Sequence, residues 1–295
     1  MLVNKLTKEE RLNQSQALQT VGLARSTYHY QSTKGSRKER FYDPALCETI
    51  LAVRKQAQVY GYRKTWARLR ALGWLVNKKR VLRYARHLGL LQPRKIKGQS
   101  FTRPAMVRPV VSNVYWEEDL TPVWCGDQTG YLFAVIDGCD KELPGEHFGD
   151  RCRSDEAADV MEQAVRKRFN GPVPPDHRLV LRIDRGTQFT ARKFRERART
   201  LNVILEYAGI KCPDDKPYIE AFFSKYKIEE VYRNEYRNLA EAKAGWELYR
   251  VWHENERVHQ SLGYRTPHEI YEMHKVNLAL QVKMTNIYQV PLCPE

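Results

Sequence analysis

The sequence predicts an α/β domain with a mixed sheet, preceded by small all-α units. Two adjacent strand-like runs between residues 123 and 137 precede a strand–helix–strand–helix alternation. This order is typical of an α/β domain whose sheet contains both antiparallel and parallel strands. Before residue 110, capped segments with helical spacing of apolar residues dominate, and they predict helices. A length of 295 residues corresponds to about two domains.

The first unit, about residues 5–30, has the pattern of a helix-turn-helix. Gly22 separates Gln14–Thr20 from a second short helical segment, Ala24–Tyr30. A tight turn with glycine between two short helices is the form of that motif.

The second unit, about residues 43–92, predicts three helices. Asp43 can cap the first of them, and Pro44 suits its first helical position. The second is expected over Arg63–Leu72, and the third over Lys78–Leu88, where a glycine follows each end. On the third helix Val81, Ala85 and Leu88 share a face, and four cations lie away from it: Lys79, Arg80, Arg83 and Arg86. Such a helix suits DNA recognition, and an ordinary solvated helix face is the alternative.

Charge is distributed unevenly along the chain. Residues 1–110 contain 24 Lys and Arg against 5 Asp and Glu, whereas residues 111–295 contain 26 against 30. The net charge is therefore +19 in the front part, −4 in the rest and +15 overall. This asymmetry indicates a polyanion-binding module joined to another domain. No apolar stretch approaches the ~20 residues of a transmembrane helix. The six cysteines have no zinc-finger spacing, so we expect reduced thiols in a cytoplasmic protein.

Beyond residue 115 the predicted elements alternate. Strands are expected over Val123–Thr129, Tyr131–Asp137, Leu179–Asp184 and Val203–Tyr207, and helices from Ser154 or Asp155 to Phe169, over Ala191–Leu201, from Pro217 onward, and from about Leu239 to His259. The segment Asp140–Asp150 is poor strand material. A strand there is therefore left open.

Three acids stand out in this part of the chain. Asp127 falls within the predicted first strand, Asp184 ends another strand, and Glu220 lies in the first turns of a helix. Carboxylates gathered at one sheet edge need a cation between them. Their oxygens suit magnesium or manganese, and a pair of such ions can promote phosphodiester cleavage. Lys227, seven residues after Glu220, faces the same way and could hold DNA phosphate.

Several stretches together resemble the OrfB-type transposases of insertion-sequence family three, whose catalytic domains are similar to retroviral integrases. The matching stretches are Gly22–Tyr28, Tyr60–Arg63, Val76–Val81, Trp124–Thr129, Asp184–Phe189, Glu220–Phe223 with Lys227, Asn255–His259 and Leu262–Pro267. Asp184 and Glu220 are separated by 35 residues, the spacing of the family. Two segments depart from the family pattern, Asp137–Lys141 and Lys211–Lys216.

The resemblance implies an RNase H-like core with a five-stranded sheet, in which Asp127, Asp184 and Glu220 bind two magnesium or manganese ions and catalyse strand cleavage and strand transfer. It implies DNA as partner, a homo-oligomer on DNA, and an upstream OrfA product as a further partner. The expected domains are 1–32 (helix-turn-helix), 41–92 (three helices), 93–112 (basic linker), 113–273 (catalytic core) and 274–295 (tail). The candidate DNA-binding residues are Lys227, Arg185, Gln188, Arg25, Arg63, Lys78, Lys79, Arg80, Arg83, Arg86, Arg94, Lys95 and Lys97.

Two alternatives stay open at this level. A non-catalytic DNA-binding regulator or assembly partner would keep the basic front part and lack one of the acids. A nuclease of RNase H type acting on RNA–DNA hybrids would not need the basic front part.

Overall fold

The computed structural model describes residues 3, 6–7, 12–28, 43–91, 109–209 and 216–276. The chain divides into two compact units, residues 1–52 and 53–295. The predicted linker residues Arg94, Lys95 and Lys97 lie outside the described residues, as does most of the predicted tail.

The first unit contains the two helices expected around Gly22. They are α2 (Gln14–Thr20) and α3 (Arg25–Tyr28). The Asn13 side chain accepts a hydrogen bond from the backbone N–H of Gln16 and caps α2. Gly22 has φ +66°, a conformation that glycine adopts without steric cost. The unit ends within α4 (Pro44–Gln56), which begins at the predicted proline.

The other two predicted front helices are α5 (Tyr62–Ala71) and α6 (Lys78–His87). The Asn77 side chain accepts a hydrogen bond from the Lys79 N–H at 2.8 Å and caps α6. On α6, Val81, Tyr84 and Ala85 are buried, and Leu82 and the following Leu88 are half-buried. Four cations of the helix are exposed: Lys78, Lys79, Arg83 and Arg86. The predicted division of α6 into an apolar and a cationic face is thus present.

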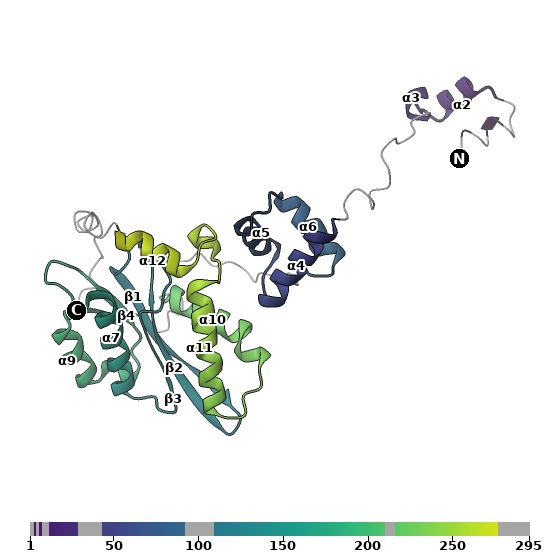
Figure 1. Cartoon of the computed structure of the whole chain (residues 1–295). Coiled ribbons are helices and arrows are strands. Elements are labelled where there is room, and N and C mark those ends of the chain that lie inside the picture. Colours follow the sequence, from purple (N-terminus) through teal and green to yellow (C-terminus); the bar gives the residue numbers. More distant parts are fainter. Residues whose placement is uncertain are drawn as a thin grey trace. The chain divides into compact units, whose positions relative to one another are not determined.

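The second unit contains a mixed five-stranded sheet with the order β3-β2-β1-β4-β5 (Figure 1). The strands are β1 (Tyr115–Cys125), β2 (Gln128–Asp137), β3 (Gly145–Gly149), β4 (Val180–Ile183) and β5 (Ile204–Tyr207). The first three pair antiparallel, and β4 and β5 run parallel to β1. The predicted α/β class with a mixed sheet is confirmed.

Helices cover both faces of this sheet (Figure 1). On one face, α7 (Ser154–Phe169) and α9 (Arg192–Thr200) pack on apolar side chains of β1, β2 and β4. On the other, α10 (Pro217–Glu229) and α11 (Leu239–Asn255) form an aromatic layer that includes Phe222, Tyr226 and Trp246. Short helices α8 (Thr187–Thr190), η2 (Val231–Arg233), η3 (Gln260–Leu262) and α12 (Pro267–Val276) complete the unit.

The first strand differs from its prediction. It begins at Tyr115, eight residues earlier than expected, and it ends at Cys125. Gly126 and Asp127 form the turn to β2. The segment Asp140–Asp150, for which the sequence did not decide between strand and loop, contains β3. This strand pairs with β2 from Tyr131 to Val135.

The β1–β2 turn depends on Gly126. Its φ of +76° is unfavourable for other residues, and a Cβ atom there would collide with the backbone carbonyl of Arg237. We expect Gly126→Ala to lower the free energy of unfolding by about 1–3 kcal/mol, measured by urea denaturation. Gly171→Ala is the control, because a Cβ there meets open space and φ is not positive. Equal stability of the two variants would contradict this role of Gly126.

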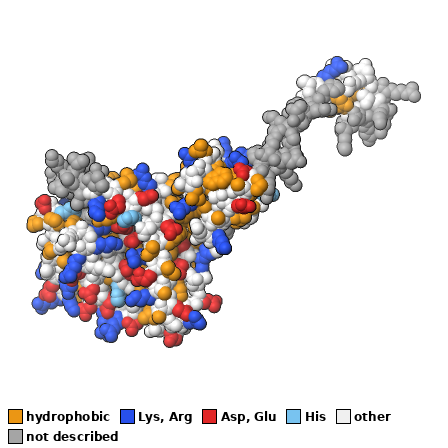
Figure 2. Space-filling view, in the orientation of Figure 1, with side chains coloured by type: hydrophobic (Ala, Val, Ile, Leu, Met, Phe, Trp, Pro, Cys, Tyr) orange, Lys and Arg blue, Asp and Glu red, His pale blue; other side chains and the backbone are white. Residues whose placement is uncertain are grey.

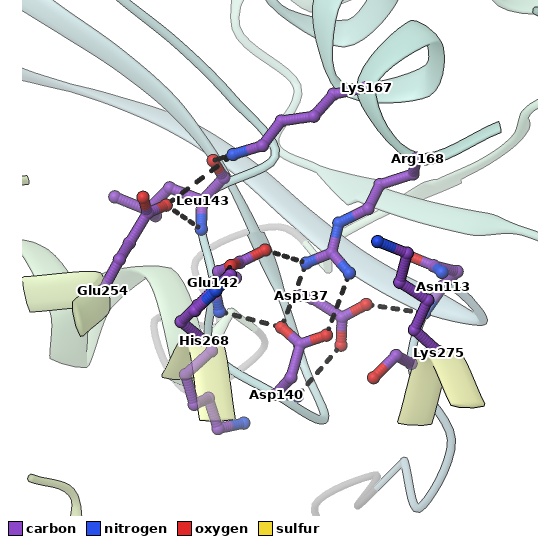
Figure 3. A network of polar contacts seen from close by, with 12 residues as sticks. Asn113, Asp137, Asp140, Glu142, Leu143, Lys167, Arg168, Glu254, His268 and Lys275 are labelled. Carbon is purple, nitrogen blue, oxygen red and sulfur yellow. Dashed lines mark hydrogen bonds and ion pairs between the residues drawn. The ribbon is translucent and has the colours of Figure 1, made fainter. Parts of the chain in front are cut away.

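A buried polar network joins the end of β2 to α7 and α12 (Figure 3). The Arg168 guanidinium, whose side chain is fully buried, contacts Asp140 at 3.2 Å and Glu142 at 2.9 Å. Asp137 accepts hydrogen bonds from the Asn113 N–H and the Trp116 indole. This network occupies the segment that departs from the family pattern. It supplies there the partners that buried carboxylates need.

A buried histidine makes stability depend on pH. Burial, followed by the charge of Arg257, lowers the pKa of His253 to about 3. The unfolded value is about 6.5, so the folded state is fully stable above that pH and loses stability as the pH falls toward 3. Between pH 6.5 and 5 we expect this group alone to cost about 2 kcal/mol. The free energy of unfolding, measured by urea denaturation at several pH values in this range, should fall less steeply with decreasing pH in His253→Gln than in the wild type. An identical pH dependence of the two proteins would contradict the assignment.

Candidate active site

The parallel pairing of β1 with β4 determines which acids meet. Glu117 pairs with Arg182. Two residues further in the same direction, this register places Asp119 beside Asp184, directly after the end of β4. The carboxyl ends of parallel strands are where α/β proteins bind ligands. Asp119 and Asp184 therefore form the acidic pair of this sheet edge.

Lys216 lies between these two carboxylates. Its ammonium nitrogen is 2.9 Å from Asp119 Oδ2 and 3.8 Å from Asp184 Oδ2. The two oxygens therefore lie no more than about 6.7 Å apart, the sum of these distances. The Lys216 side chain is 7 % exposed, whereas those of Asp119 and Asp184 are 20 % and 42 % exposed. Both carboxylates are thus partly exposed to solvent, whereas the ammonium that contacts them is buried.

Helix α10 brings Glu220 to the same edge. Glu117 Oε2 accepts hydrogen bonds from the backbone N–H groups of Tyr218 and Ile219, each at 2.8 Å. A carboxylate at a helix N-terminus satisfies unpaired N–H groups and is favoured by the helix dipole. The Glu220 N–H donates to the Lys216 carbonyl at 3.2 Å. The exposed Glu220 therefore follows Lys216 by one helical turn.

Asp127 does not belong to this group, and the expectation that it gathers with Asp184 and Glu220 is wrong. It lies in the β1–β2 turn, beyond the end of β1. The six residues of strand from Asp119 to Cys125 extend about 20 Å. Asp127 is therefore too far along the hairpin to share an ion with Asp184. Asp119 is the acid of β1 that lies beside Asp184, and it was not among the residues predicted from the sequence.

Burial changes the ionisation of the acidic run in β1. It raises the pKa of Glu117 to about 7, although the N–H groups of Ile219 and Tyr218 oppose the rise. It also raises the pKa of Asp119, against the effect of the Lys216 charge. The pKa of Glu118 is raised well above its usual value. Neither carboxylate oxygen of Glu118 has a hydrogen-bond partner among the residues that the structure describes.

Two predicted DNA-binding residues, Arg185 and Gln188, lie within four residues after Asp184. The Asp184 carboxylate accepts the Gly186 N–H at 2.7 Å, which begins the short helix α8. Arg185 is exposed, and its guanidinium lies 5.8 Å from the Tyr207 ring. Gln188 is half-buried. Arg185 therefore lies in the loop after Asp184, and Gln188 lies in the short helix α8 that follows it.

Lys227 lies two turns beyond Glu220 on α10. With the exposed Trp124 and Tyr232 it lines a hollow of about 470 Å³. Arg25, Arg63, Lys78, Lys79, Arg83 and Arg86 are exposed, and Arg80 is half-buried. On the face in Figure 2, cations and acids are interspersed over the sheet-containing part rather than forming one basic surface.

The donor set at Asp119 and Asp184 fits a divalent cation. Carboxylate oxygens are the ligands that magnesium prefers, and the structure already places a cation, the Lys216 ammonium, between them. Within residues 109–209 and 216–276, as elsewhere in the described chain, no three His, Cys, Asp or Glu side chains are gathered at metal-binding distance. A site of three carboxylates would require Glu220 to come closer to the two aspartates.

Models of known protein families match three parts of the chain. Residues 110–209 and 202–267 match integrase core domains, and residues 42–97 match an HTH-like domain. A curated relative from Burkholderia multivorans, an uncharacterised 31.7 kDa protein of insertion element IS407, is 25 % identical over 267 residues, which cover 90 % of this chain and 92 % of that protein. The transposase InsD of insertion element IS2 from Escherichia coli is 30 % identical over 260 residues, covering 82 % of this chain and 83 % of that one.

The chain belongs to the insertion-sequence family-three transposases. It is thus a polynucleotidyl transferase of the DDE type with an RNase H-like core. The predicted family, enzyme class and fold class are confirmed.

Solved structures similar to this transposase include viral integrases. One is a simian T-cell lymphotropic virus intasome in complex with a PP2A regulatory subunit, with TM-score 0.48 and 13 % identity, covering 77 % of this chain and 76 % of that one. Another is the HTLV-2 integrase catalytic core in complex with magnesium, with TM-score 0.37 and 16 % identity, covering 54 % and 95 %. In the described part of the transposase, no helix has the length and apolar character needed to cross a membrane.

Proposed function

We propose that this transposase binds the ends of an insertion element and carries out strand cleavage and strand transfer at Asp119, Asp184 and Glu220. The observation that carries this proposal is the pairing of Asp119 with Asp184 around a buried cation, beside the N-terminus of the helix that bears Glu220. Phosphoryl transfer requires positive charge held where negative charge develops, and this group of acids can hold it.

Asp119 and Asp184 would bind magnesium or manganese from the sheet, and Glu220 would bind it from α10. When bound there, a pair of such ions would activate a water or a 3′-hydroxyl and stabilise the leaving oxygen. Glu117 would not bind the ion itself. It fixes the N-terminus of α10 through its two hydrogen bonds and so positions Glu220. Asp184 also receives the Gly186 N–H, which orients its carboxylate.

DNA would be bound by cations on both units. The exposed cations of α6, Lys78, Lys79, Arg83 and Arg86, suit a helix docked on DNA, with Arg80 at the border of that face. Arg25 and Arg63 would add contacts from the preceding helices. At the catalytic part, Lys227, Arg185 and Gln188 would contact phosphates or bases near the acids. The proposed domain division, including the basic linker 93–112 with Arg94, Lys95 and Lys97, assigns these contacts to separate modules.

Assembly and cellular site follow from the same proposal. Two element ends must be joined to one target, so the active form would be a homo-oligomer on DNA, with an upstream OrfA product as a further partner. A protein that acts on chromosomal DNA of a prokaryote would work in the cytoplasm, at the nucleoid.

An end-cleavage assay tests this function. Labelled element-end DNA is incubated with the protein, with and without OrfA, in Mg²⁺, and nicked and joined products are resolved on a denaturing gel. We expect Asp184→Asn to abolish both products and to keep DNA binding in a gel-shift experiment. Asp176→Asn, at an exposed acid away from the sheet edge, is the matched control and should keep full activity. Cleavage that survives Asp184→Asn would overturn the proposed function.

A further inference from the structure

We infer that Lys216 is the internal counter-cation of the metal site, which a divalent ion must displace and which thereby sets the metal affinity of this transposase. The inference rests on the proposed metal site at Asp119, Asp184 and Glu220. It concerns one residue in the segment Lys211–Lys216, where the chain departs from the family pattern.

The position of the ammonium group carries the argument. It lies 2.9 Å from one carboxylate and 3.8 Å from the other, with a side chain only 7 % exposed. A buried ammonium is stable only where its charge is compensated, and these carboxylates compensate it. The same oxygens are the ones expected to bind the ion. One pair of acids cannot hold both cations at short distance, because the ammonium and the ion repel each other.

The neighbouring backbone fixes the origin of this side chain. The Lys216 carbonyl accepts the Glu220 N–H. The N–H groups of Tyr218 and Ile219, in the first turn of α10, donate to Glu117. Release of the ammonium therefore requires rotation of the lysine side chain and leaves α10 in place. Lysine has a long side chain with many rotamers, so this rotation is feasible without unfolding of the helix.

Two consequences follow for the protein without metal. The ammonium reduces the repulsion between Asp119 and Asp184, so the site stays ordered before an ion arrives. The ammonium also lowers the affinity for that ion, because binding of the ion must first break the charge-assisted contact of Lys216. Loss of one such contact corresponds to about a tenfold or larger change in the binding constant.

Metal titration of variants tests the inference. Mn²⁺ binding to the full chain is followed by calorimetry for the wild type, Lys216→Met and Lys225→Met, each with and without Asp184→Asn. Lys225 is an exposed lysine on the same helix and serves as the control for charge. We expect Lys216→Met to bind Mn²⁺ roughly tenfold more tightly, to have a lower melting temperature without metal, and to gain more in melting temperature on Mn²⁺ addition. Unchanged or weaker binding in Lys216→Met would overturn the inference.

A second measurement uses only the wild type and does not depend on the folding of a variant. Lysines are acetylated briefly with acetic anhydride, with and without Mg²⁺, and each site is quantified by mass spectrometry. We expect the reactivity of Lys216 to rise severalfold with Mg²⁺ and that of Lys225 to stay constant. Constant reactivity of Lys216, while Mn²⁺ still binds in an Asp184-dependent way, would contradict the counter-cation role alone. Absence of Asp184-dependent binding in every variant would instead contradict the proposed metal site.

Discussion

Asp119→Asn should abolish strand cleavage and strand transfer, whereas Asp127→Asn should leave both within about twofold of the wild type. Asp119 lies beside Asp184 at the sheet edge, and an amide in its place keeps the shape and removes the charge that attracts a divalent ion. Loss of one ligand from a phosphoryl-transfer site is expected to lower the rate by about a thousandfold or more. Asp127 lies at the hairpin turn, where the same substitution changes only a solvated acid.

The comparison separates a catalytic effect from a structural one. Both variants are measured in the same end-cleavage assay, with far-UV circular dichroism and DNA binding as controls for folding. Asp119→Asn that folds and binds DNA but makes no product supports the assignment. Strong loss in Asp127→Asn with retained activity in Asp119→Asn would reverse it.

Arg168→Met should destabilise the fold by about 3–5 kcal/mol, the cost of removing one partner from a buried ion pair. The Arg168 side chain is fully buried against Asp140 and Glu142 (Figure 3). Its guanidinium lies 3.7 Å from the centroid of the Tyr271 ring. Without it, Asp137, Asp140 and Glu142 remain as buried acids with no guanidinium among them. Urea denaturation of the full chain, followed by circular dichroism, measures the loss.

The control for this variant is Arg166→Met, two residues earlier on α7. Arg166 is 71 % exposed and pairs with Glu162 across one helical turn, so its loss should cost less than about 1 kcal/mol. Burial raises the pKa of Asp137 to about 6. Arg168 lowers this pKa, so its removal raises the pKa of Asp137 further. The penalty of Arg168→Met should therefore shrink as the pH falls from 8 toward 6, because protonation of Asp137 removes charge from the unpaired acids. Equal penalties for Arg166→Met and Arg168→Met at pH 7 would contradict the structural role of the network.

The local sequence pattern was sufficient to predict most helices and the parallel strands β4 and β5. Helix α7 begins at the predicted Ser154 and ends at Phe169, and α10 begins at Pro217, because caps and proline act within one turn of the chain. The strands β4 and β5 lie within the predicted apolar runs. The formation of these elements depends on residues that are close together in the sequence, so a single sequence is enough to predict them.

The start of β1 could not be predicted in this way. The run Glu117-Glu118-Asp119 has the composition of a loop, yet all three lie within the strand. The partner that makes Glu117 tolerable is the N-terminus of α10, about a hundred residues later. Long-range compensation of this kind leaves no local signal.

The misplacement of Asp127 had a signal that was available. Gly126-Asp127 is a turn dipeptide between two runs of β-branched and aromatic residues, which indicates a hairpin turn. A turn there shifts the first strand toward the N-terminus and makes Asp119 its central acid. Lys216 is different, because only the folded structure shows that this lysine points between two aspartates.

Anomalous scattering from a crystal of the transposase soaked in Mn²⁺ tests the central claim most directly. The account predicts an anomalous peak between the carboxylates of Asp119 and Asp184, within reach of Glu220, with the Lys216 side chain turned away. A peak at Asp127, or an active crystal form with no ion at Asp119 and Asp184, would contradict it.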